Sequence, residues 1–392
     1  MVVAVKKGLA RVQELYQDRS KRVKELKAEG KKIAGYLCIY PVTEIMTALD
    51  LVPYRVLGDM REPITRSDAY LPPVVCPFLR SCLDIGLKGR YDFLDAMITS
   101  HICDVGSSLS GIWRYTVKTP FHYNIDTPHT IHDTSLAQTK AVLKAFQTAM
   151  ETFAGKKITP VMLENAIKKH NEQRAMVREL YESKKQDPPL ITGSETLKVI
   201  KAIQSLPVNE GNALLREVIS EVKTRVNKPL KKNARLLVWG SILDDTAMIE
   251  MIESLDAYVV IDDTCVGSRA FFDDVKLTKD PIDGLAQHYL VDIKCPRTFR
   301  TRDFYAVKKN YMEDLKSRFS YLADYVRDWH ANGVILQSVR YCDTHGYEVP
   351  QIRDYLKEVG IPSIYLEHDY TEGALSPMKT RVQGFLEIIE QL

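Results

Sequence analysis

The chain has 392 residues, 45% hydrophobic and 27% charged, which is the composition of a globular protein. Its 54 basic and 51 acidic residues give a net charge of +3 at pH 7, so there is no electrostatic basis for binding nucleic acid or an anionic membrane surface. No run approaches the ~18 apolar residues of a membrane helix, so we expect a cytoplasmic protein, and the length exceeds one ordinary hydrophobic core.

Residues 1–31 place apolar side chains at helical spacing among many charges, and they lack the apolar core and cleavage site of a secretory signal. We expect one N-terminal helical segment there. Residues 32–134 then alternate strands and helices, which predicts a first α/β domain. The predicted strands are KKIAGYLCIY, VPYRVLG, a strand within YDFLDAMITS, and TPFHYNID; the predicted helices are PVTEIMTALDL and CPFLRSCLDIGLKG.

Residues 135–228 carry long amphipathic patterns, such as SLAQTKAVLKAFQTAMETFAG, without a convincing strand, so we expect a helical connector. Alternation resumes in residues 229–392, which predicts a second α/β domain with strands at LLVWG, AYVVIDD, VILQSV and PSIYLEHD. A loop-rich stretch to about residue 305 follows the second of these strands. The fold class is therefore α/β, with two doubly wound parallel sheets, the second half repeating the architecture of the first.

Seven cysteines are spread over the chain, an odd number that a reducing cytosol would keep as free thiols. Cys103, Cys265 and Cys342 each come just after a predicted strand, and Cys76 opens a predicted helix. Ligands of open α/β sheets bind beyond the carboxyl ends of the strands, and a helix N-terminus favours a thiolate. We therefore expect these thiols to converge on the cleft between the two domains.

Thiolates from distant loops suit an iron–sulfur cluster or a zinc ion. The sequence contains no CxxC pair and no HxxxH pair, which argues against zinc. The alternative for any single cysteine is a small apolar residue of the core. That interpretation fits best for Cys38, which we place within a strand, and for Cys82, which we place inside a helix.

Four stretches resemble, in order and spacing, the 2-hydroxyacyl-CoA dehydratase and benzoyl-CoA reductase family: CPFLRSCLD, YDFLDAMITSHICDVGSSLSGIW, RYCDTHGYEVPQIRDYL, and GIPSIYLEHDY with the closing KTRVQGFLE. The resemblance runs from about residue 30 to the end. It implies two Rossmann-like domains with helical additions, and a [4Fe–4S] cluster in the interdomain cleft that three cysteines hold, leaving one iron open. By position in the motifs, these are Cys76 in VVCPF, Cys103 in HICDV and Cys342 in RYCDT.

The resemblance also implies a function and partners. The substrate would be an acyl-CoA or aryl-CoA, and a homologous second cluster subunit, or a second copy of this chain, would complete the enzyme. A separate homodimeric iron–sulfur ATPase, the activator, would deliver electrons of very low potential. This chain has no GxxxxGK[ST] loop, which fits the use of ATP by a partner.

Within the family, ICDV…LSGIW and ITPVMLENAIKKHNEQRAMVRELY look most like the smaller cluster subunit of ATP-dependent benzoyl-CoA reductases. One alternative is a subunit of a 2-hydroxyacyl-CoA dehydratase, which eliminates water through a ketyl radical. Another is an electron-relay or double-cubane protein without an acyl-CoA substrate. Cys265 and Cys295 fall near two double-cubane positions, but the further cysteine expected beside Cys295 is missing, which favours a single cubane. A plain nucleotide-binding protein would need a glycine-rich loop that the first strand lacks.

Three residues beside the motif cysteines are candidates for catalysis: His101, Asp104 and Asp343. His101 could donate a hydrogen bond to the cluster or the thioester, and Asp104 and Asp343 could relay protons, since a reduction consumes protons as well as electrons. For both aspartates the alternative role is to cap the helix that follows.

Arginines near two other cysteines are candidates for binding the phosphates of CoA. Arg269 lies in DDTCVGSR, and Arg297, Arg300 and Arg302 lie in CPRTFRTR. For Arg269 a loop ion pair is the alternative, and for the others it is a solvated run of charge.

Overall fold

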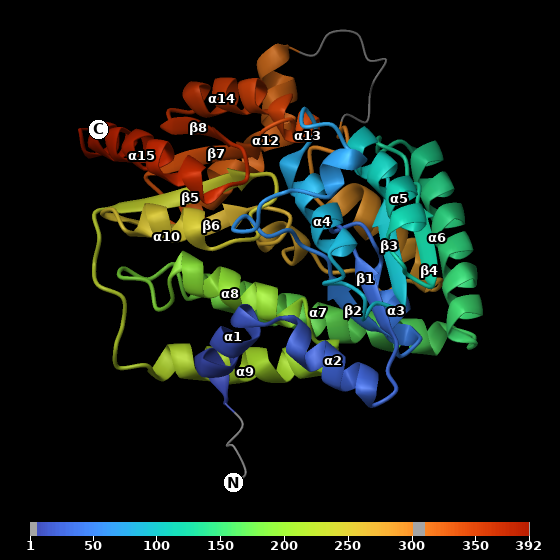
Figure 1. Cartoon of the computed structure of the whole chain (residues 1–392). Helices are drawn as coiled ribbons and strands as arrows, with labels where there is room; N and C mark the ends of the chain where they lie inside the picture. Colours follow the sequence, from blue (N-terminus) through green and yellow to red (C-terminus); the bar gives the residue numbers. More distant parts are fainter. Residues whose placement is uncertain (1–5, 301–309, 392) are drawn as a thin grey trace.

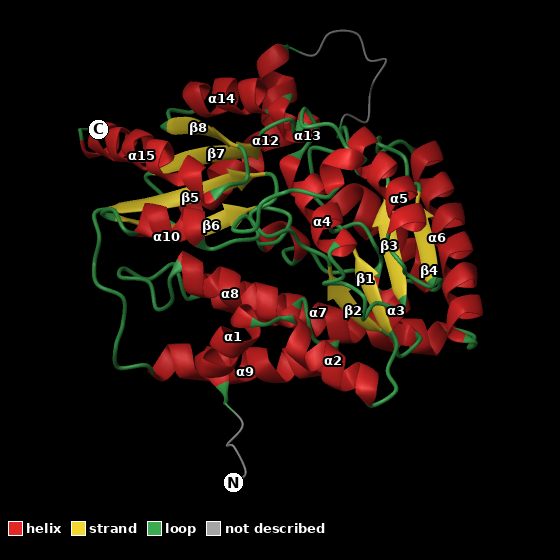
Figure 2. Cartoon of the chain, viewed as in Figure 1, coloured by secondary structure: helices red, strands yellow, loops and turns green. Residues whose placement is uncertain are grey.

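The computed structural model describes residues 6–300 and 310–391, and within them the chain forms two parallel sheets of four strands each (Figures 1 and 2). The first sheet has the strand order β2-β1-β3-β4 and the second has the order β6-β5-β7-β8. The two orders are equivalent, which confirms the α/β class and the repeated, Rossmann-like architecture. The strands are β1 (Ile33–Tyr36), β2 (Val52–Arg55), β3 (Ala96–Ser100), β4 (Phe121–Ile125), β5 (Ala234–Gly240), β6 (Ala257–Asp263), β7 (Gly333–Val339) and β8 (Ser363–His368).

The order of strands reverses at one place in each sheet, between β1 and β3 in the first and between β5 and β7 in the second. Loops at such a switch point leave in opposite directions and open a crevice at the carboxyl ends of the strands. The strands β5, β6 and β7 are buried along their whole length, as is expected when helices cover both faces of a parallel sheet.

Helices cover the sheets, and a further helical layer runs along both of them (Figure 1). In this layer α7 packs on α3 of the first half, and α8 packs on β6 and α10 of the second half. None of the helices within the described residues is long and apolar enough to cross a lipid bilayer. The helices are α1 (Gly8–Gln17), α2 (Ser20–Ala28), α3 (Thr43–Ala48), α4 (Pro77–Leu87), α5 (Asp104–Thr116), α6 (Asp133–Ala154), α7 (Pro160–Glu182), α8 (Gly193–Ile203), α9 (Val208–Thr224), α10 (Ala247–Glu253), α11 (Pro281–Gln287), α12 (Tyr311–Asp328), α13 (Asp343–Gly346), α14 (Val349–Glu358) and α15 (Leu375–Glu390).

The N-terminal segment differs from its prediction. Two helices, α1 and α2, replace the single helix expected over residues 1–31, of which residues 1–5 lie outside the described part. The break is at Asp18, whose carboxylate accepts hydrogen bonds from the Ser20 amide (2.9 Å) and the Ser20 hydroxyl (2.7 Å). A side chain that captures a backbone amide in this way competes with the helical hydrogen bond and starts a new helix.

The stretch after β6 was expected to be rich in loops to about residue 305, and most of it as far as residue 300 lies outside helices and strands, but not all of it. It contains α11 and a π-helical turn at His288–Asp292. Asp280 begins α11 by accepting the Ile282 amide (3.1 Å), and a proline follows at the first helical position. Residues 301–309 lie outside the described part, and so does the candidate Arg302.

This same stretch crosses from the second half of the sequence onto the first. In α11 and just before it, Asp283 and Asp280 form ion pairs of 3.0 Å with Lys140 and Lys144 of α6. Farther along, the Phe299 amide donates to the His129 carbonyl (2.7 Å). Residues from both halves of the chain therefore meet at the carboxyl end of the first sheet.

A close contact fixes α4 against α5. Gly86 of α4 faces the fully buried ring of Trp113 in α5, and a Cβ at this glycine would stand 2.9 Å from the indole Cη2. The indole N–H donates to the Thr119 hydroxyl (3.1 Å), which holds the ring in place. The two helices pack this closely only because residue 86 has no side chain.

We expect Gly86→Ala to lower the free energy of unfolding, although alanine favours a helix over glycine by about 1 kcal/mol, because overpacking a buried site costs about 1–3 kcal/mol. Gly111→Ala is the matched control, since Gly111 is an exposed position of α5 where a Cβ meets nothing within 4 Å. That variant should raise the stability by up to about 1 kcal/mol. Urea unfolding measures both, and equal stabilisation by the two substitutions would contradict the close packing.

Candidate functional site

Three of the cysteines begin helices. Cys76 is the N-cap of α4, Cys103 is the N-cap of α5, and Cys342 is the N-cap of α13. The Cys103 sulfur accepts a hydrogen bond from the Gly106 amide (3.3 Å). Unpaired amides and the positive end of the helix dipole therefore face each thiol, an arrangement that stabilises a thiolate or an anionic group bound to it.

These three thiols lie in one neighbourhood and act on one another. Burial raises the pKa of Cys76, and the charges of Cys342 and Cys103 raise it further. Burial also raises the pKa of Cys103 to about 11 against the opposing Gly106 hydrogen bond, and the charge of Cys342 adds to it. Burial is again the main cause that raises the pKa of Cys342. The three thiols are therefore protonated at neutral pH unless a bound cation displaces the protons.

A single metal ion and a polynuclear cluster require different distances between their ligand atoms. Ligands that share one tetrahedral ion, at about 2.3 Å from it, stand within about 4 Å of each other. Across residues 6–300 and 310–391, no three His, Cys, Asp or Glu side chains are arranged in this way around a single ion. A polynuclear cluster makes a different demand, because each thiolate binds its own iron and the sulfurs stand farther apart. The assignment of these three cysteines to such a centre stays a prediction.

A buried polar chain supports Cys342. His345 of α13 places its Nδ1 3.4 Å from the Cys342 sulfur, and its Nε2 faces Nη1 of Arg269 at 3.1 Å. An arginine N–H can only donate, so Nε2 accepts and the imidazole proton lies on Nδ1, within reach of both the Cys342 sulfur and the Thr344 hydroxyl (3.3 Å). Burial and the charge of Arg269 lower the pKa of His345 well below its usual range, which keeps the ring neutral.

Arg269 is held in turn by Asp263 at the end of β6. Its Nε donates to the carboxylate (2.9 Å) and its Nη2 donates to the backbone carbonyl (2.6 Å), and both side chains are buried. Tyr321 donates to the other carboxylate oxygen (2.9 Å). These contacts match the loop ion pair considered as the alternative for this motif, and they orient His345. The role of Arg269 toward a CoA phosphate stays a prediction.

His101 belongs to a second polar group beside Cys103. Its Nδ1 lies 2.8 Å from the carboxylate of Asp126, and its ring packs edge-on against His129 at 4.6 Å between centroids. Burial, Arg297 and His101 lower the pKa of His129 to about 4. Sequence reasoning missed Asp126 and His129, although both follow β4 in YNIDTPHT, where the rule on strand ends would have found them.

Arg297 clamps the loops of the first half. It is buried, and its nitrogens donate to the carbonyls of His101 (2.8 Å), Pro128 (2.7 Å) and Thr127 (2.5 Å). Arg300 donates to the carbonyl of Ile293 (2.8 Å). These hydrogen bonds of Arg297 and Arg300 order the segment that crosses from the second half onto the first. The expected contact of either arginine with a CoA phosphate stays a prediction.

The two aspartates that follow motif cysteines are not helix caps. Asp104 and Asp343 are the first residues of α5 and α13, and the preceding cysteines hold the N-cap positions. Asp343 is close enough to Cys103 to raise the pKa of that thiol, so it faces the same space. Its role in proton transfer remains a prediction, as does that of Asp104.

A further group of thiols lies close by. Cys38 lies beyond β1 and not within a strand as expected, because its φ of 72° is left-handed and incompatible with strand geometry. Burial raises its pKa, with further contributions from the charges of Cys265 and Cys295. The same two cysteines raise the pKa of Cys342, which places them next to the first group. Cys82 is inside α4 and buried, as expected.

Two cavities lie at the boundary between the halves. One, of about 590 Å³, is lined by Pro77 and Tyr341, the neighbours of Cys76 and Cys342, and by Arg61, Arg80 and Arg340. The other, of about 710 Å³, shares part of its wall with the first. The shared residues are Asp59, Met60, Arg61 and Tyr370. Both volumes lie in the range of small-molecule sites, about 300–1,000 Å³.

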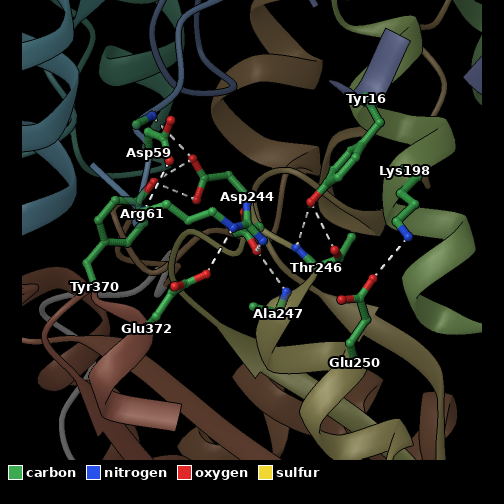
Figure 3. Close-up of polar contacts among 12 residues, drawn as sticks. Tyr16, Asp59, Arg61, Lys198, Asp244, Thr246, Ala247, Glu250, Tyr370 and Glu372 are labelled. Atoms are coloured by element: carbon green, nitrogen blue, oxygen red, sulfur yellow. Dashed lines mark hydrogen bonds and ion pairs between the residues drawn. The ribbon is translucent and has the colours of Figure 1, made fainter. Parts of the chain in front are cut away.

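Polar contacts across the shared wall join the two halves (Figure 3). Tyr370 donates to both carboxylate oxygens of Asp244 (2.9 and 2.8 Å), and Arg61 bonds Asp245 (2.6 and 3.0 Å) and Glu372 (3.0 Å). Burial raises the pKa of Asp244, which makes it a candidate proton donor that sequence reasoning missed. It follows β5 in GSILDD, a strand end that the sequence shows.

Comparison with known proteins places this site in a family. Residues 38–389 match the family described as 2-hydroxyglutaryl-CoA dehydratase, D-component. The chain is 27% identical over 391 residues to a benzoyl-CoA reductase subunit of Thauera aromatica, covering 97% of this chain and 98% of the relative. It is 25% identical over 388 residues to the beta subunit of lactoyl-CoA dehydratase of Anaerotignum propionicum, with coverage of 97% and 98%.

A third relative is the beta subunit of (R)-2-hydroxyglutaryl-CoA dehydratase of Acidaminococcus fermentans, 24% identical over 366 residues, with coverage of 92% and 93%. These relatives are subunits of both reductases and dehydratases, and the match extends over nearly all of the described chain. The chain therefore belongs to the 2-hydroxyglutaryl-CoA dehydratase D-component family, which confirms the resemblance carried by its cysteine motifs.

Proposed function

We propose that this chain is the iron–sulfur subunit of a cytoplasmic enzyme that reduces an aromatic acyl-CoA in one-electron steps, with a [4Fe–4S] cluster held by Cys76, Cys103 and Cys342. The observation that carries the proposal is the proximity of three thiols, one buried and two half-buried, at helix N-termini from both halves of the chain. The similarity to the benzoyl-CoA reductase subunit of Thauera aromatica supports the choice of reaction. When bound, such a cluster supplies electrons of low potential.

The protein's part in this chemistry is to hold the centre away from water and to stabilise negative charge. The helix N-termini offer amides to the sulfurs, as Gly106 does for Cys103. His345 adds an N–H directed at Cys342, fixed by Arg269. Hydrogen bonds to cluster sulfurs stabilise the more negative, reduced state, so these contacts tune the reduction potential.

Proton delivery falls to groups around the same space. His101, oriented by Asp126, lies two residues before Cys103, and a third of its side chain is exposed, so it can exchange protons with solvent. Asp343 faces Cys103. We assign both to proton transfer, and Asp104 keeps the same assignment from the motif.

The CoA thioester would enter the 590 Å³ cavity beside the cysteines. Its lining contains Pro77 and Tyr341, which suit an apolar acyl group, and Arg61, Arg80 and Arg340, which suit phosphates. Arg300, half-buried in the crossing segment, remains a further phosphate ligand in this proposal.

Two partners complete the proposal. A homologous cluster subunit or a second copy would form the enzyme, as the relatives are themselves named as subunits. An iron–sulfur activator ATPase would donate the electrons. A dehydratase acting on a 2-hydroxyacyl-CoA is the second candidate function, favoured by the 25% identity to the beta subunit of lactoyl-CoA dehydratase.

Cys103→Ser should lose most of the iron of anaerobically purified protein without unfolding it, because serine is a poor ligand for iron in such a cluster. Iron and sulfide analysis, with circular dichroism for the fold, measures this. Cys82→Ala, in the same region but inside α4, is the control and should keep its iron. Full iron content in Cys103→Ser would remove this residue from the ligand set.

His345→Phe should lower the reduction potential of the cluster by roughly 30–60 mV, equivalent to about 1 kcal/mol, because it removes a hydrogen bond that favours the reduced state. His345→Asn keeps an N–H donor in the same region and should recover part of the shift. Redox titration followed by electron paramagnetic resonance measures the potential at unchanged iron content. An unaltered potential in the phenylalanine variant would show that Nδ1 does not serve the cluster.

Titration of the reduced complex with two thioesters separates the candidate reactions. Benzoyl-CoA should change the electron paramagnetic resonance spectrum of this subunit if it is a reductase, whereas a 2-hydroxyacyl-CoA should do so if it is a dehydratase. The spectrum of this subunit could respond to neither thioester while the spectrum of the partner subunit does respond. Electron relay would then be the only one of these roles left for this chain.

A further inference from the structure

A smaller cavity lies away from the motif cysteines. It measures about 70 Å³, and none of its lining residues is a cysteine. Three parts of the chain meet there: Arg55 ends β2, Arg174 lies in α7, and Phe271 and Tyr289 come from the segment after β6. The Arg55 amide donates to the carbonyl of Gln204, just after α8 (3.0 Å), so β2 and the helical layer are in direct contact (Figure 1).

The cavity wall contains a buried arginine for which no ion pair is found among the described residues. Arg55 is 2% exposed, and its Nε and Nη2 have no hydrogen-bond partner in the described chain. Arg174 is also buried and bonds Glu44 (2.6 Å), but its Nε likewise has no partner there. Two buried arginines with unpartnered nitrogens therefore line one small space.

The nearby acid is already paired. Glu44 accepts from Arg174 and from the hydroxyl of Tyr289 (2.8 Å). Burial opposes its ionisation, but Arg174 and His170 outweigh burial and lower the pKa of Glu44 to about 2, so it is ionised. The negative charge of Glu44 balances the positive charge of Arg174. It does not also balance the positive charge of Arg55.

The thiols near Arg55 do not supply the missing charge. Arg55 acts to lower the pKa of Cys38, Cys82 and Cys265, but burial is the larger effect and raises all three. These thiols remain protonated at neutral pH. His170, on the cavity wall, is neutral as well, since burial lowers its pKa to about 4.

We propose that this cavity binds a small oxyanion of the size of phosphate, with Arg55 as its main ligand and Arg174 beside it. A buried charge is normally paired, and a guanidinium matches the oxygen atoms of phosphate. The volume fits: one water needs about 10–15 Å³ by the same kind of measure, so the cavity has room for one small oxyanion with little solvent. Because three parts of the chain line the cavity, the bound anion would tie the first sheet to the helical layer and to the second half.

The test uses the full chain, free of iron, because the site involves none of the motif cysteines. Phosphate should bind saturably in isothermal titration calorimetry and raise the melting temperature more than sodium chloride of equal ionic strength does. Arg55→Met, which replaces the charge by an apolar side chain of similar length, should weaken phosphate binding at least about tenfold. Arg353→Met, at an exposed position of α14, is the matched control and should bind phosphate as the parent does.

Stability without phosphate provides a second readout. Removing an unpaired buried charge should leave Arg55→Met at least as stable as the parent in phosphate-free buffer, and less stable than the parent at saturating phosphate. If Arg55→Met does not fold, equilibrium dialysis with labelled phosphate replaces this measurement. It compares the parent with Arg55→Lys, which should bind phosphate with reduced affinity. No saturable binding to the parent, or equal binding by parent and Arg55→Met, would overturn the proposal.

Coenzyme A also carries a phosphate group, so it is the other possible source of the phosphate that binds in this cavity. Displacement of bound phosphate by coenzyme A, but not by its 3′-dephospho form, would identify the phosphate as part of the cofactor. Binding of phosphate without displacement by either would identify the free ion.

Discussion

The thiols of Cys76, which is buried, and of Cys103 and Cys342, which are half-buried, lie near one another, and the pKa of each is raised by burial and by neighbouring thiols. Three negative charges at such a place are stable only if something positive binds them and if donors surround them. The helix N-termini supply the donors, since each thiol is an N-cap. These features support the proposal that the three residues are ligands of a cationic centre.

Polar contacts around the site hold the two halves of the chain together. The segment that carries Arg297 leaves the second sheet and grips three carbonyls of the first half. Arg61 of the first half pairs with Asp245 of the second. The proposed ligand set, drawn from both halves, would keep its spacing only if the halves do not move apart, so the proposal links domain packing to cofactor retention.

Buried arginines take different roles in this protein according to what faces them. Arg269 lies between a carboxylate and an imidazole, and its fixed donors decide which nitrogen of His345 carries the proton. Arg297 faces carbonyls and orders loops. Arg55 has no partner for two of its nitrogens within the described chain. The same residue type thus acts as a positioning group, as a clamp and, in our proposal, as an anion ligand, and only the neighbours distinguish the three.

Patterns among neighbouring residues were enough to predict the α/β class, the repeated architecture and the family, because strand and helix periods and cysteine motifs are local properties. They also placed Cys103, Cys265 and Cys342 after strands and Cys76 before a helix. They did not reveal the helix break at Asp18, where a single side-chain hydrogen bond outweighs a continuous apolar period. Which charges are buried, and what faces them, became visible only in the folded chain. Arg269 and Arg297 look like exposed phosphate ligands in their polar motifs, yet both are inside the protein. Burial and pairing depend on long-range packing, which no local pattern encodes, and these two quantities set the charge state of each group at the site.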